Sequence, residues 1–155
     1  MLVCVVGIIS ITPIHFNWSI IMANIQLQRG QQQQVDVTYK LAGETDAANF
    51  SAAGAYDAEI VIRKKRGDNY MGQIIDVLRH GATSPASSEA DSRILFNYVS
   101  ASGPNIQLKW STAEASFLPN EEITVYGDLK IIQVSSGETI HHVRLAFDIL
   151  PEITP

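Results

Sequence analysis

Few residues of this chain are of a type that could perform chemistry, and their spacing matches no common catalytic or metal site. His141 and His142 are adjacent. Neighbouring side chains of a β-strand point to opposite faces, so this pair cannot bind one metal ion from a strand. His15 and His80 lie far away in the sequence, and Cys4 is the only cysteine. We therefore predict no metal site, and we expect His141 to be partly buried at the edge of a core.

The acidic residues and the known motifs lead to the same expectation. Asp57 with Glu59, and Glu121 with Glu122, are close in sequence but carry no sign of a shared function. The stretch Gly67-Asp68-Asn69 lacks the alternating oxygen ligands of a calcium loop. The chain contains no Gly-x-Ser-x-Gly, no phosphate-binding loop and no His-Glu-x-x-His. We expect no catalytic residue, no cofactor and no enzymatic activity.

One cluster of cations, Arg63-Lys64-Lys65-Arg66, needs an explanation. A nucleic-acid site would need aromatic residues among the cations, and only Tyr70 is near. The net charge of −5 also argues against nucleic acid as a partner. We interpret the cluster as a charged hairpin tip that discourages pairing between sheet edges, with contact to an acidic neighbour as the functional alternative.

The elements that would position these residues are β-strands. At 155 residues, with 46% hydrophobic and 17% charged side chains, the chain is long enough for one globular domain and is not generally disordered. Side chains alternate clearly from Thr139 to Ile149, which indicates a half-buried strand. We expect eight or nine strands, near residues 25–28, 35–41, 59–65, 73–79, 94–98, 106–110, 122–134 and 139–150. Residues 73–79 also fit a helical turn.

Turns and core residues follow from the same pattern. Ser111 and Glu114 have capping-box spacing, which predicts one helical turn through Phe117. Gly137 is central to a turn that joins the last two strands as a hairpin. We expect Trp110 to contribute most to the core, because aromatic burial dominates small sandwiches. The predicted core is Ile60, Ile62, Ile94, Phe96, Leu108, Trp110, Val125, Leu129, Val143, Leu145 and Phe147.

Residues 1–21 differ from the rest of the chain. They are apolar, contain no Lys or Arg and are interrupted by Pro13. They lack the cationic start of a secretory signal and the uninterrupted length of about 20 residues that a spanning helix needs. Two interpretations remain open: an apolar arm that docks on a neighbouring subunit, or upstream sequence before a start at Met22. A membrane anchor ranks behind both, and we expect no membrane partner.

The last third of the chain resembles a loose group of virion domains from tailed bacteriophages. The matching residues are Ile106 to Trp110, Ser111 to Pro119, Tyr126-Gly127-Asp128-Leu129, Gly137 and Pro151 to Thr154. The chain departs from the group at Asn120-Glu121-Glu122, where such domains commonly carry glycine, and in a longer Asn69 to Asp91 region. The resemblance implies an antiparallel immunoglobulin-like sandwich over residues 22–155, an all-β fold, with residues 1–21 as an apolar N-terminal extension.

The resemblance also implies a function. It predicts a non-enzymatic structural protein of the tail, baseplate or neck of a virion, which assembles as a homo-oligomer with other virion proteins. Tyr126 could then pack at the edge of the core with its hydroxyl toward the Leu118-Pro119 corner, like a tyrosine corner. The alternative is a carbohydrate- or receptor-binding β-sandwich module, in which Tyr56 and Tyr70 would line a shallow site.

Overall fold

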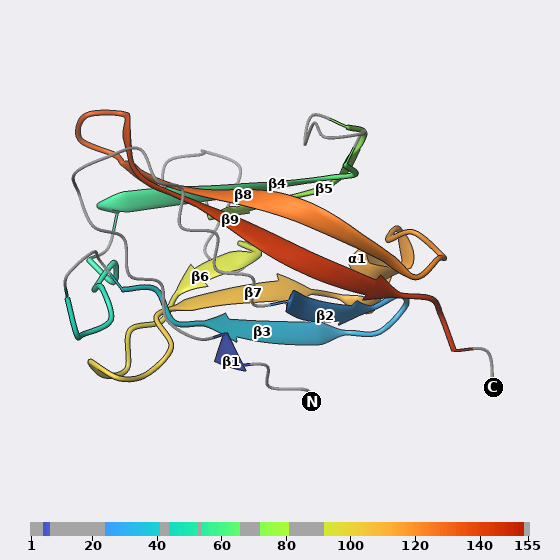
Figure 1. Ribbon diagram of the computed structural model, residues 1–155. Coiled ribbons are helices and arrows are strands. Elements are labelled where there is room, and N and C mark those ends of the chain that lie inside the picture. Colours follow the sequence, from blue (N-terminus) through green and yellow to red (C-terminus); the bar gives the residue numbers. More distant parts are fainter. Residues whose placement is uncertain are drawn as a thin grey trace.

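The computed structural model describes residues 24–40, 44–52, 54–65, 72–80 and 92–153, and the backbone of Val5 and Val6. These residues form nine strands and one short helix, in two sheets that lie as two layers around a common core (Figure 1). The all-β prediction is confirmed. The elements are β1 (Val5–Val6), β2 (Asn24–Gln28), β3 (Gln33–Val37), β4 (Tyr56–Arg63), β5 (Ile74–His80), β6 (Ile94–Phe96), β7 (Ile106–Trp110), α1 (Thr112–Ser116), β8 (Ile123–Gln133) and β9 (Glu138–Leu150).

The strand order brings together segments that are distant in the sequence. One sheet has the order β1-β3-β7-β6 and the other has the order β2-β9-β8-β4-β5. The pairs β1–β3 and β2–β9 are parallel, so the expectation of purely antiparallel sheets was wrong. β1 and β2 each lie at the edge of a sheet and pair with a strand that is not the next one in the sequence. No hairpin turn connects either pair, and only such a turn would require the two strands to be antiparallel.

The β8–β9 hairpin is the longest continuous pairing in the described structure. The predicted alternation in β9 is confirmed from His141 onward, where Val143, Leu145, Phe147 and Ile149 are buried. It was wrong at the start of the strand: the register shifts there, so that Ile140 packs against the core and Thr139 is exposed. The turn before β9 places Gly137 at a φ of +70°. That left-handed conformation favours glycine.

Several strand boundaries differ from the expected ones. β4 begins at Tyr56, β3 ends at Val37 and β6 ends at Phe96, while residues 74–80 form a strand and not a helical turn. Of the longer Asn69 to Asp91 region, residues 69–71 and 81–91 lie outside the described residues. Of the N-terminal extension, only Val5 and Val6 are described, and they pair with residues 36 and 37 of the same chain. The boundary between residues 21 and 22 stays a prediction.

Every predicted core residue is buried except Phe96, which is half-buried against the core. Trp110 is 1% exposed, and its ring centroid lies 6.2 Å from that of Phe147 in the facing sheet. Asn105 is an unpredicted buried polar residue. Its side-chain oxygen accepts from the Tyr39 N–H (2.8 Å), and its amide nitrogen donates to the carbonyls of Tyr39 (2.8 Å) and Ala48 (2.6 Å). Asn105 thus provides hydrogen-bond partners for backbone groups in the segment that follows β3.

Gly127, in the centre of β8, is packed too closely for any side chain. A Cβ there would lie 2.8 Å from Cγ2 of Ile60 and 2.9 Å from Cε2 of Phe147. We expect Gly127→Ala to lower the free energy of unfolding by about 1–3 kcal/mol, because the added methyl overpacks the core. Urea unfolding measures this loss. Lys130→Ala, an exposed change on the same strand, is the control with an expected effect within about 0.5 kcal/mol. Equal stability of both variants would contradict the packing argument.

Candidate functional site

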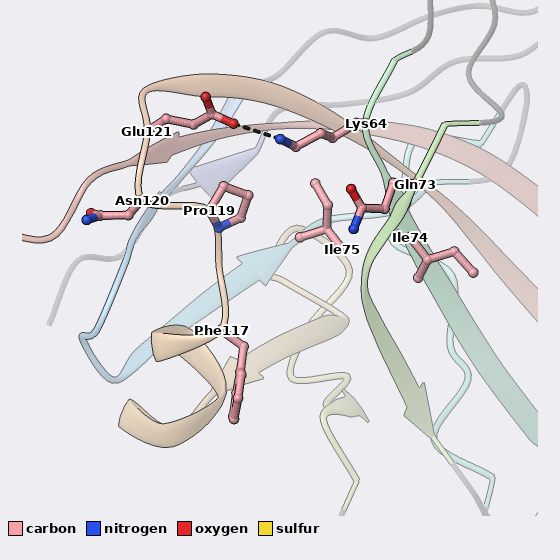
Figure 2. Close-up of a pocket in the computed structure, with 8 residues that line it drawn as sticks. All are labelled: Lys64, Gln73, Ile74, Ile75, Phe117, Pro119, Asn120 and Glu121. Atoms are coloured by element: carbon pink, nitrogen blue, oxygen red, sulfur yellow. Dashed lines mark hydrogen bonds and ion pairs between the residues drawn. The ribbon is translucent and has the colours of Figure 1, made fainter.

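A hollow of about 370 Å³ opens at one end of the sandwich, between the β4–β5 hairpin and the turn that follows α1 (Figure 2). The C-terminal tail leaves the molecule at this same end (Figure 1). The apolar lining residues are Ile74, Ile75, Phe117 and Pro119, and the polar ones are Lys64, Gln73, Asn120 and Glu121. The two sides of the hollow come from segments that are far apart in the sequence.

The α1 side is held by a complete capping box. The Glu114 N–H donates to Ser111 Oγ (3.2 Å), and the Ser111 N–H donates to the Glu114 carboxylate (2.7 Å), as the sequence predicted. The Gly30 N–H donates to the carbonyl of Ala115 (3.1 Å) at the other end of the helix. These bonds fix a helix of five residues that would be unstable alone.

The end of α1 directs one large side chain inward and one outward. Leu118 is buried, and its carbonyl accepts a hydrogen bond from Arg29 Nε (2.9 Å). Phe117 is 83% exposed and projects from the end of the helix at the lower side of the hollow in Figure 2. The buried Leu118 therefore anchors this turn, and Phe117 is left to solvent.

The hairpin side depends on a close approach between two backbone segments. The Lys64 N–H donates to the Gln73 carbonyl (3.0 Å), and a Cβ on Gly72 would lie 1.9 Å from the Lys64 carbonyl oxygen. Lys64 Nζ then forms an ion pair with Glu121 (2.7 Å), which bridges the hollow in Figure 2. Arg63 of the cationic cluster ends β4, and Lys64 and Lys65 follow it, while Arg66 and the hairpin tip expected there lie outside the described residues.

The chemistry of this hollow suits contact with another surface. Among its described lining residues, the charges are one ammonium and one carboxylate that already pair, and the other polar side chains are the amides Gln73 and Asn120. The exposed apolar groups Phe117 and Ile74 lie beside them. Such a mixture of apolar and neutral polar groups is typical of protein contact surfaces.

A second polar cluster joins the two sheets beside Trp110. The guanidinium of Arg93 donates two hydrogen bonds to the Asp76 carboxylate (2.8 and 2.7 Å) and lies 3.0 Å from Glu114, and Trp110 Nε1 donates to Asp76 (2.9 Å). Burial alone would raise the pKa of Asp76, but the Arg93 charge and hydrogen bonds, with those of Trp110 and Val77, hold this pKa below its ordinary value. This cluster was not predicted, because nothing in the amino-acid sequence marks residues 76 and 93 as partners.

The histidine and carboxylate expectations have clear structural outcomes. His141 is half-buried as predicted, with its ring 5.4 Å from that of Tyr39 and 5.7 Å from that of Phe50, and burial lowers its pKa. Glu59 forms an ion pair with Arg79 (2.9 Å) on the sheet surface. Among the described residues, no group of three or more His, Cys, Asp or Glu is arranged to hold a metal ion.

Of Tyr56, Tyr70 and Tyr126, the structure describes Tyr56 and Tyr126. Tyr126 is half-buried, but it belongs to the face of β8 opposite the buried Val125 and Leu129. The expectation that it packs at the core edge was wrong, because the alternation of the strand turns it outward. Tyr56 packs edge-on against Phe50 at a centroid distance of 5.3 Å. Tyr70 lies outside the described residues.

The described fold and hollow define an all-β protein of two sheets with a partly apolar surface at one end. No protein family matches the chain, and no curated protein is similar to it in sequence. No helix in the described part of the chain is long and apolar enough to cross a membrane.

Proposed function

We propose that this chain is an immunoglobulin-like domain that serves as a non-enzymatic structural component of a tailed-bacteriophage virion, in its tail, baseplate or neck. The strand order supports the immunoglobulin-like part. In such folds one sheet has the order A-B-E-D, and the other contains C, F and G, with C′ added in variable-type domains. Here β3-β7-β6 corresponds to B-E-D, and β5-β4-β8-β9 corresponds to C′-C-F-G. The chain departs from that pattern at β1, which takes the place of A beside β3 but runs parallel to it, and β2 adds a parallel strand beside β9.

The virion part is supported by the segment that resembles phage domains. This segment supplies β7, α1, β8 and β9. The structure also explains why particular residue types occupy the motif positions of this segment. Ser111 caps α1, Gly127 leaves room for Ile60 and Phe147, and Gly137 adopts a positive φ in the hairpin turn. All three roles stabilise the fold, so the resemblance supports a shared type of domain.

One observation carries the assembly role: large hydrophobic side chains are exposed on the surface. Among the described residues these are Ile74, Val99, Phe117 and Ile153. Isolated exposed hydrophobics are common, but Phe117 and Ile74 line one hollow. Homo-oligomeric assembly, alone or on other virion proteins, would cover this surface.

The experiment that tests this function uses the full chain. Its mass is measured by light scattering over a wide concentration range, and the samples are imaged by electron microscopy, alone and mixed with phage particles. We expect rings, a lattice or decoration of a tail, baseplate or neck. A chain that stays monomeric at high concentration and binds no virion protein would contradict the proposal.

The alternative, a carbohydrate- or receptor-binding module, has weaker support. Tyr56, one of its two expected aromatic residues, uses its ring to pack against Phe50 and Phe96. Binding of a monomer to a glycan array would favour this alternative over assembly.

A further inference from the structure

The surface around the hollow contains apolar side chains that the fold does not require. Phe117 is 83% exposed and Ile74 is 48% exposed. At the end of α1 it is the backbone of Phe117 that serves the helix, since its N–H donates to the Glu114 carbonyl (3.2 Å). The phenyl ring contributes little to that role, and any hydrophilic residue could provide the same N–H.

Among the described residues that line the hollow, the charges are balanced. Lys64 and Glu121 pair at 2.7 Å, with 35% and 54% of their side chains exposed, while Gln73 and Asn120 are uncharged. A partner with a strongly charged face would find no net charge to bind here. A second copy of the same surface offers one cation and one anion, and it is therefore complementary in charge to the first.

We propose that this hollow is the contact between two copies of the chain, related by a two-fold axis. Phe117 of each copy packs against the apolar lining of the other, and Lys64 of each copy faces Glu121 of the other. A two-fold contact uses the same patch on both copies, and it covers both exposed phenyl rings in one closed interface. This inference deepens the proposed assembly role and rests on it.

The C-terminal tail enlarges the same surface. The Glu152 N–H donates to the side-chain oxygen of Asn120 (3.1 Å), which lines the hollow, and the next residue, Ile153, is exposed. The tail therefore begins at the rim of the hollow. Its apolar side chain adds contact area toward the roughly 800 Å² per partner that specific interfaces bury.

Phe117→Ser in the full chain tests the contact. Each dimer would lose two buried phenyl rings, so we expect at least a 100-fold rise in the dimer dissociation constant, measured by analytical ultracentrifugation. Val99→Ser is the matched control, because Val99 is also exposed, at 70%, and lies outside the hollow. It should leave the dissociation constant within about threefold, and circular dichroism confirms that both variants fold.

A charge exchange tests the orientation of the two copies. Lys64→Glu places like charges across the axis and should weaken association, and the double variant K64E/E121K should restore it. Self-association of Phe117→Ser equal to that of the unchanged chain would overturn this inference alone. A monomeric chain that still binds virion particles would also overturn it, and would leave the virion role standing. A monomer that binds no virion protein would contradict both proposals.

Discussion

Trp110→Ala is expected to lower the free energy of unfolding by about 4 kcal/mol, the size typical of removing a buried tryptophan. Trp110 is 1% exposed, and it packs edge-on against Phe147 of the facing sheet. It also gives the Asp76 carboxylate one of its hydrogen bonds, at 2.9 Å. The substitution opens a cavity between the sheets and removes that bond, and urea unfolding followed by circular dichroism measures the loss.

Trp110→Phe separates the two contributions. Phenylalanine keeps most of the apolar volume but cannot donate to Asp76, so about half of the loss should remain. If Trp110→Ala costs less than about 1 kcal/mol, Trp110 does not join the sheets as described.

Asp76→Ala is expected to cost about 3 kcal/mol, because removing one partner of a largely buried ion pair leaves the other uncompensated. Arg93 would lose a bidentate carboxylate, and Trp110 Nε1 would lose its acceptor. Both charged side chains are less than one-fifth exposed, so solvent screens the pair only partly. Glu59→Ala is the matched control: its ion pair with Arg79 is on the surface, and an exposed pair contributes about 0–1 kcal/mol.

The effect of Asp76→Ala on the free energy of unfolding is also expected to depend on pH. The pKa of Asp76 is lower in the folded state than its ordinary value of 3.8, so the folded protein favours the ionised carboxylate. This contribution is fully present above pH 3.8 and is lost as pH falls through the lower folded value. The stability difference between the unchanged chain and Asp76→Ala should therefore shrink below about pH 4. A difference that stays constant from pH 6 to the acid limit of folding would refute the role of the ionised form.

Trp110 and Asp76 also interact with each other through a hydrogen bond. If the Trp110–Asp76 hydrogen bond matters, the effects of Trp110→Phe and Asp76→Ala should add to more than the effect of the double variant. Strict additivity would show that Asp76 acts through Arg93 alone.

The sequence alone determined the features that depend on neighbouring residues. The alternation in β9 after its irregular start, the hairpin turn at Gly137 and the capping box of Ser111 and Glu114 were all predictable. Each depends on rules that operate over two to four residues: the two-residue period of a strand, the φ > 0 of a tight turn, and the orphan N–H groups of a helix start. The buried faces of β4, β7, β8 and β9 followed from the same rules, and ten of the eleven predicted core residues belong to the observed core cluster.

Which distant residues meet depends on long-range packing, which no local pattern predicts. β2 pairs with β9 in parallel, Asn105 binds the backbone of Tyr39, and Arg93 binds Asp76 across the two sheets. The candidate site arose in the same way, because Lys64 on the hairpin and Glu121 after α1 are 57 positions apart. Sequence patterns over a few residues do not predict such pairs. Which surfaces come together depends on how the whole core packs, and Phe117 is part of the candidate contact surface only because the fold places it with Ile74 around one hollow.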